Sequence, residues 1–144
     1  MRKFKKVVNL TPHSITIVNN GRSWTIEPSG VVLRAVEFDS EPFQVVVEEI
    51  GLEAVGVVRR YGAPQEGMLI VNGSKSVHGR TYCYYGEPDT LYLVSLPLMQ
   101  VLAVSGIFVL NFAAPDTGKG AIRNEQGQIV AVKGLIFVNG EEGE

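Results

Sequence analysis

The chain has 144 residues, the length of one domain, and 45% of them are hydrophobic, enough to bury a single core. Its 13 lysines and arginines and 15 aspartates and glutamates leave a formal net charge of −2, which argues against a protein that binds the phosphate backbone of nucleic acid. A single cysteine, Cys83, excludes an intramolecular disulfide framework and fits a reducing compartment.

The N-terminal residues 1–6 are basic, but no long apolar stretch follows them, so we expect no secretion signal. The longest apolar windows, 91–104 and 106–114, are shorter than a membrane span and are interrupted by polar residues or glycine. We therefore expect a cytoplasmic protein with neither nucleic acid nor membrane as a partner.

Short apolar runs alternate with Gly, Pro, Asn and Asp, which is typical of an all-β domain. The first two strands are expected at residues 14–19 and 24–27, around the turn Asn20-Gly21, because both turn residues tolerate positive φ. Further strands are predicted at 31–38, 43–50, 53–61, 68–71 and 81–85, with a polar loop at 72–76.

The one helix that the sequence predicts covers about residues 96–105. Ser95 can cap its first turn, and Pro97 lies near its start, where the missing N–H costs nothing. Leu98, Val101 and Leu102 then share a face, and Gly106 is typical of a residue that ends a helix.

A strand at 107–112 and a final hairpin formed by 120–124 and 128–138 complete the pattern. No repeat or linker is visible, so we predict one β-rich domain over residues 1–139. The fold class is mainly β, a single-domain barrel or sandwich with one short helix. Residues 140–144 are expected to form a flexible acidic tail.

The first motif with chemically capable groups is Asn9-Leu10-Thr11-Pro12-His13. In an extended segment Asn9 and Thr11 point to the same face, and Pro12 presents His13 at the edge of a loop. The amide, hydroxyl and imidazole could bind a polar ligand. Alternatively, Asn9 and Thr11 only close a turn by bonding to nearby backbone groups.

The second motif runs from Pro115 to Arg123 and contains Asp116-Thr117-Gly118-Lys119-Gly120. Its glycines let backbone N–H groups approach a ligand, while Lys119 and Arg123 can meet anionic oxygens. The alternative is a surface turn in which Asp116 bonds to the backbone and pairs with Arg123. A single Asp-Thr-Gly is weak evidence for an aspartic protease, and the Walker phosphate loop is absent because Ala121 follows Gly120.

Other chemistry finds little support in the sequence. His13, His78 and Cys83 are too few for a zinc site, and no spacing points to further carboxylate ligands. Cys83, in an apolar strand, is more typical of a buried small hydrophobe than of a nucleophile. We therefore expect no metal and no cofactor, and we favour binding over catalysis.

The order of these motifs resembles a family of small uncharacterised proteins encoded by phages, prophages and bacteria. The matching segments are Asn9 to His13, 27–30, 91–95, Pro115 to Gly118, 121–123 and 127–130. The resemblance implies a phage or bacterial cytosolic context, which is the host cytoplasm if a phage encodes the protein, without an established activity. The chain departs from the family pattern in an excursion at 72–85 and in the apolar segment 107–111, which replaces an Arg-x-Asp.

Three functions follow from this pattern as hypotheses. The first is a homo-oligomeric binding protein for a small anionic ligand, nucleotide-derived compounds being candidates, which could sequester a host defence signal. Its pocket would be lined by Asn9, Thr11, His13, Asp116, Thr117, Lys119 and Arg123. The second is a decoration or assembly protein located in a virion. The third is a hydrolase with His13 as general base, oriented by Asp116.

Overall fold

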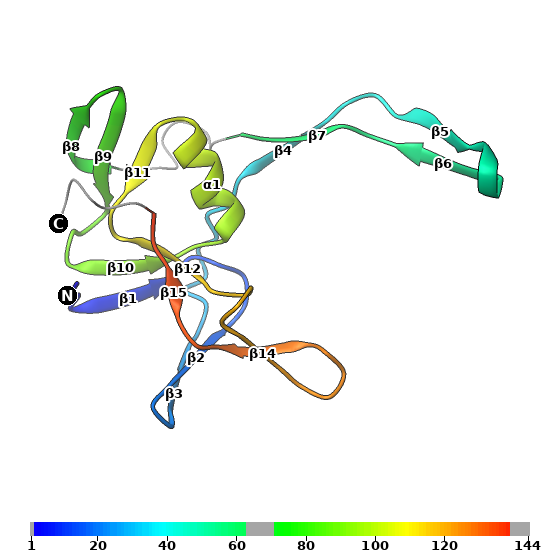
Figure 1. Ribbon diagram of the computed structural model, residues 1–144. Helices are drawn as coiled ribbons and strands as arrows, with labels where there is room; N and C mark the ends of the chain where they lie inside the picture. Colours follow the sequence, from blue (N-terminus) through cyan, green and yellow to red (C-terminus); the bar gives the residue numbers. More distant parts are fainter. Residues whose placement is uncertain (1, 63–70, 139–144) are drawn as a thin grey trace.

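The computed structural model describes residues 2–62 and 71–138. The strand expected at 68–71 falls almost wholly outside this part, and the tail expected at 140–144 lies outside it altogether. The described part is mainly β, as predicted, with a single α-helix and several separate sheets (Figure 1). None of these sheets closes into a barrel, so the barrel that was one of the two expected forms is not built.

The central sheet has the strand order β1-β10-β12-β15, in which the first three strands are parallel and β15 is antiparallel to β12. Its strands are β1 (Lys6–Asn9), β10 (Thr90–Leu93), β12 (Phe112–Pro115) and β15 (Leu135–Ile136). Leu93 and Ala113 are completely buried, as expected for parallel strands that are covered on both faces. Because β1 and β12 are parallel, the two polar motifs follow their strands at the same edge of this sheet.

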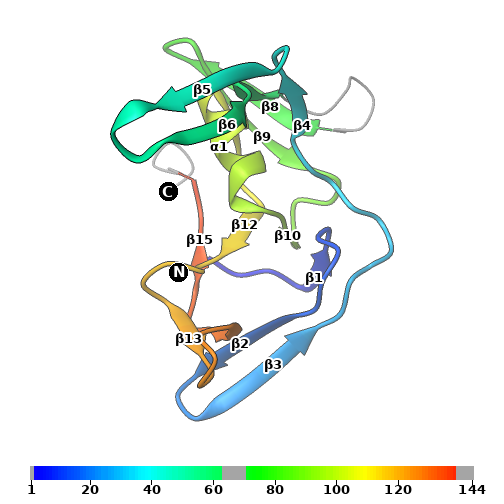
Figure 2. The ribbon, with the colours of Figure 1, turned by 90° about the vertical axis from the view of Figure 1, so that its right-hand side faces the viewer.

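The second sheet has the order β13-β14-β2-β3 and lies at the lower end of the molecule in Figures 1 and 2. Its strands are β2 (Ile15–Asn19), β3 (Arg22–Ile26), β13 (Ala121–Arg123) and β14 (Ile129–Val132). The predicted turn is confirmed, since Asn20 and Gly21 have φ of 52° and 74°. The final hairpin is also formed, with β15 as a separate strand after β14.

The third sheet contains β8 (Val71–Val77), β9 (Arg80–Tyr85) and β11 (Ile107–Val109), with β9 in the middle. The polar loop expected at 72–76 is therefore wrong, because this segment pairs with β9 as a strand. The turn between them is His78-Gly79, with φ of 51° and 77°, so it has the positive φ of a tight hairpin turn without its usual sequence.

The helix α1 (Leu96–Val104) confirms the predicted helix. The Ser95 Oγ accepts a hydrogen bond from the Leu98 N–H at 3.4 Å, and Gly106 has the positive φ of a residue beyond a helix end. Leu98, Met99 and Leu102 are buried in the core. Val101, expected on this face, is only partly buried.

Two of the predicted long strands are interrupted. Of residues 31–38 only the end is a strand, because Leu33 turns into the core and donates its N–H to the Leu10 carbonyl at 2.9 Å. The run at 107–112 is divided at Asn111, so that β11 joins the third sheet and β12 the central one. A single apolar run therefore contributes one strand to each of two sheets.

The strands expected at 43–50 and 53–61 form a long antiparallel hairpin. It consists of β4 (Val36–Asp39), β5 (Phe43–Val47), the one-turn 3₁₀ helix η1 (Glu48–Ile50), β6 (Leu52–Gly56) and β7 (Arg59–Gly62). β5 pairs with β6 and β4 with β7. We call this hairpin, residues 36–62, the arm. Figure 1 shows its outer part, β5, η1 and β6, extending away from the other elements, while its root, β4 and β7, lies near α1.

Candidate functional site

Asn9 organises the first polar motif from within. It is 1% exposed, its Nδ2 donates to the carbonyls of His13 (2.8 Å) and Ile26 (3.0 Å), and its Oδ1 accepts from the N–H (2.9 Å) and Oγ1 (2.7 Å) of Thr11. All four hydrogen-bonding positions of the amide are therefore occupied. These bonds match the alternative in which Asn9 and Thr11 close a turn. The His13 side chain is exposed.

Replacing Asn9 by alanine is expected to lower the free energy of unfolding by about 2–3 kcal/mol, because buried backbone groups lose their partners. Thr117→Ala is the matched control, since its exposed hydroxyl has no partner in the described part of the chain and its loss is expected to cost under about 0.5 kcal/mol. Urea unfolding followed by circular dichroism measures both variants. Equal stability of the two would contradict the structural role of Asn9.

The second motif is also held by local hydrogen bonds. The Asp116 Oδ1 accepts the Gly118 N–H at 3.2 Å, and the Arg123 Nη1 donates to the Gly127 carbonyl at 2.6 Å, which closes the β13–β14 turn. A Cβ at Gly120 would lie 2.7 Å from the Asp116 Oδ2, so the glycine is required there. The side chains of Thr117 and Lys119 are exposed.

The two motifs share an edge of the central sheet without bonding to each other. Asn9 is opposite Leu93 on β10, and Leu93 is opposite Ala113 on β12, so one strand separates the two motifs. Within the described part of the chain no hydrogen bond or ion pair joins them, and in particular none joins His13 to Asp116. Inside the second motif, the described residues likewise show no ion pair between Asp116 and Arg123. The anion-binding corner therefore stays a prediction from the sequence.

Other reactive groups are placed in structural surroundings. Cys83 is 1% exposed, and burial raises the pKa of its thiol, which disfavours the nucleophilic thiolate. Among the described residues no three His, Cys, Asp or Glu side chains gather in a way that could hold a metal ion. In the same part of the chain no helix has the length and apolar character that crossing a membrane requires.

Asn111 lies at the end of the apolar segment 107–111. It is completely buried, and its Nδ2 faces the carbonyls of Tyr85 (2.7 Å), Glu87 (3.0 Å) and Thr90 (3.0 Å), while its Oδ1 accepts the Tyr85 N–H at 2.8 Å. One amide thus fixes the whole connection between β9 and β10. Asn111 is a structural residue of the core.

The most unusual surface of the molecule is the arm. Its large apolar side chains are exposed, most of them within regular strands. They are Phe38, Phe43, Val46, Val47, Ile50, Leu52, Val55, Val57, Val58 and Tyr61. On β5 and β6 the directly opposed residues share a face, which puts Phe43, Val45, Val47, Leu52 and Ala54 together. We call this set the apolar face of the arm.

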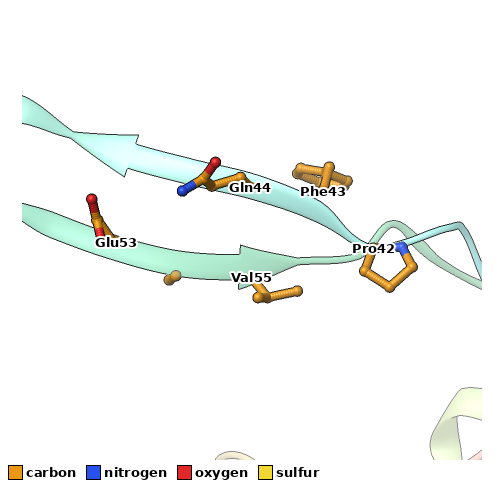
Figure 3. Close-up of a pocket in the computed structure, with 6 residues that line it drawn as sticks. Pro42, Phe43, Gln44, Glu53 and Val55 are labelled. Atoms are coloured by element: carbon orange, nitrogen blue, oxygen red, sulfur yellow. The ribbon is translucent and has the colours of Figure 1, made fainter.

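A shallow groove of about 380 Å³ lies on the arm near the start of β5 and the end of β6 (Figure 3). It is lined by Pro42, Phe43, Gln44, Glu53, Ala54 and Val55. The Phe43 ring covers Gly56 on the opposite strand, since a Cβ there would lie 2.8 Å from it. The arm therefore has a defined shape and an apolar surface for contact.

The root of the arm carries charged side chains on one of its sides. Arg59 donates to both carboxylate oxygens of Asp39, at 2.8 and 3.0 Å, and this hydrogen bonding lowers the pKa of Asp39. Glu37 lies 3.8 Å from the same guanidinium. Arg60, in contrast, has no hydrogen bond or ion pair in the described part of the chain.

A second groove, of about 410 Å³, lies where the root of the arm meets α1. It is lined by Tyr61 and Gly62 of β7, by Pro97, Gln100, Val101 and Val104 of α1, and by Ser105. Val104 is 90% exposed, although valine is normally buried. The helix contributes no charged side chain.

No protein-family model, curated protein or solved structure matches this chain. Two regions of the described chain stand as candidate sites, the shared edge of the two polar motifs and the arm with the groove at its root. In the first, the amide of Asn9 and the carboxylate of Asp116 are engaged in turns. In the second, large apolar side chains face solvent.

The sequence predicts the strands of the arm but not their exposure. An apolar run such as Phe-Gln-Val-Val-Val is equally typical of a strand buried in a core. The usable signal is the length of the apolar hairpin together with the acidic pair Glu48-Glu49 at its tip, which does not suit a core. That signal indicates a hairpin that lies outside the core.

Proposed function

We propose that the protein is a self-assembling structural subunit that joins neighbouring copies through its arm. The observation that carries the proposal is the outer part of the arm, β5 and β6, a two-stranded ribbon with an apolar face against which no third strand or helix of the described residues packs (Figure 1). An isolated two-stranded hairpin is marginal in water and normally needs further packing. Exposed apolar surface of this kind marks an interaction site.

Covering the apolar face of the arm supplies the driving force. Phe43, Val47 and Leu52 are each still 39–47% exposed. Burying the remainder of such side chains contributes roughly 1 kcal/mol apiece. When two arms cover each other's apolar faces, both contribute this free energy of burial, which stabilises an assembly of defined geometry.

The distribution of charge favours a second copy of this chain as the partner. Residues 41–56 contain four glutamates, Glu41, Glu48, Glu49 and Glu53, and neither lysine nor arginine. All 13 lysines and arginines lie elsewhere in the chain. The acidic end of one arm is therefore complementary to the remainder of another copy. Since the sequence resembles phage and prophage proteins, the form that we propose is a virion decoration or assembly complex.

Val47 and Leu52 face each other across the arm, and the double substitution Val47→Lys with Leu52→Glu tests the proposal. The new cross-strand pair keeps the hairpin in register and leaves the net charge unchanged, but it places two charged side chains in the apolar face. We expect the association constant measured by multi-angle light scattering over a dilution series to fall at least 100-fold.

The matched control is Val31→Lys with Val130→Glu, which makes the same chemical change at valines that are 59% and 52% exposed outside the arm. This variant should assemble like the unmodified chain. The proposal is wrong if the arm variant keeps its association constant, or if the unmodified chain is monomeric at every concentration.

A further inference from the structure

We infer that the tip of the arm, residues 48–51, docks in the groove between β7 and α1 of a second copy. The inference rests on the proposed self-assembly and names the surface that receives the arm. Donor and acceptor then belong to the same chain, so every copy offers one of each.

The chemistry of the groove suits an aliphatic side chain. Val101 and Val104 of α1 and Tyr61 of the arm's root supply its apolar lining. A volume of about 410 Å³ admits more than one side chain. Because Val104 is 90% exposed, a side chain placed over it would bury apolar surface on both partners.

The tip of the arm presents a matching side chain. Ile50 is 72% exposed at the end of η1, where Gly51 with φ of 66° reverses the chain. A positive φ of this size favours glycine, so Gly51 stabilises the turn that holds Ile50 at its end. Ile50 is thus the apolar anchor that the groove would accept.

Charged groups on either side of these apolar parts are complementary. Glu48 and Glu49 directly precede Ile50 at the tip, and neither forms an ion pair in the described part of the chain. Arg60 precedes Tyr61 on β7, so its side chain lies on the opposite face of the strand pair, the face that it shares with Phe38. Arg60 has no ion pair among the described residues, whereas Arg59 is engaged by Asp39. The glutamates of one copy therefore bring negative charge to the root of the other copy's arm, where Arg60 is a positive charge without an ion pair in the described part of the chain.

The arrangement of donor and acceptor permits reciprocal docking. The groove lies at the root of the arm, and the tip lies about 45 Å away, given about 3.3 Å for each residue from Val36 to Ile50. Two arms packed antiparallel place each tip at the root of the other. Such a two-fold contact is self-complementary and closes. In this arrangement the apolar faces of both arms also lie against each other.

Chains that carry one added cysteine test the docking site. Chains with Ile50→Cys are mixed with chains that carry Val104→Cys and a mass tag, and a short bis-maleimide joins thiols that are close together. The native Cys83 is 1% exposed, so we expect it not to react. The unmodified chain treated in the same way is the control for this. We expect linked dimers of unlike chains, at least five times more than when Val31→Cys replaces Val104→Cys.

The alternatives give different products. Linkage between two Ile50→Cys chains, without linkage to Val104→Cys, means that arms meet tip to tip and overturns the docking site while leaving self-assembly intact. An oligomeric mass without linkage of unlike chains overturns it as well. A monomeric mass at all concentrations overturns the proposed function itself.

Discussion

Asn111→Asp is expected to lower the free energy of unfolding at pH 7 by about 4 kcal/mol or more. The substitution turns an amide donor into a carboxylate that faces three carbonyl oxygens in a fully buried site. A buried polar group without a partner costs about 1–3 kcal/mol, and a buried charge costs more. Since domains of this size are stable by only about 5–15 kcal/mol, the loss approaches unfolding.

The same variant should recover stability as the pH falls. Burial raises the pKa of such a carboxyl in the folded state above its unfolded value, so the folded state binds the proton more tightly and stability declines as pH rises. Asn124→Asp is the control, because the Asn124 Oδ1 accepts from the N–H groups of Gln126 and Gln128 and a carboxylate can do the same. Urea unfolding at one fixed protein concentration measures both. Equal losses for the two variants would contradict the role of Asn111.

Elements whose structure is decided locally could be predicted from the sequence. The Asn20-Gly21 hairpin follows from two residues that accept positive φ, and α1 follows from its Ser95 cap and Pro97. The strand β8 could not, because residues 72–76 are polar and have the composition of a loop, and because its two-residue turn to β9 uses His78 in place of a usual turn residue. Asn111 likewise divides an apolar run by bonding to residues more than twenty positions away.

The polar motifs illustrate the same limit for sites. Asn9 and Asp116 are residues that a ligand pocket and a tight turn use equally, and only the three-dimensional partners distinguish the two uses. For the arm, Val47 and Leu52 have the sequence pattern of buried strands. Their exposure depends on the path of the chain, which leaves the core after the buried Leu33 and carries the hairpin into solvent.

Removing the end of the arm is expected to abolish self-assembly while preserving the fold of the remaining protein. Ser40 and Val58 lie opposite each other, with the Ser40 N–H donating to the Val58 carbonyl at 2.9 Å. Replacing residues 41–57 by Asn-Gly closes the hairpin at this point with the turn that the chain already uses at Asn20-Gly21. Circular dichroism and the urea midpoint verify that the shortened chain is folded.

Sedimentation velocity of the intact and the shortened chain tests the central claim most directly. The account predicts that the intact chain sediments as an oligomer whose mass is a multiple of 15.7 kDa, and that the shortened chain sediments as a folded monomer at the same concentration. Two chains that sediment in the same oligomeric state, whether monomeric or assembled, would contradict the claim that the arm joins copies of this protein.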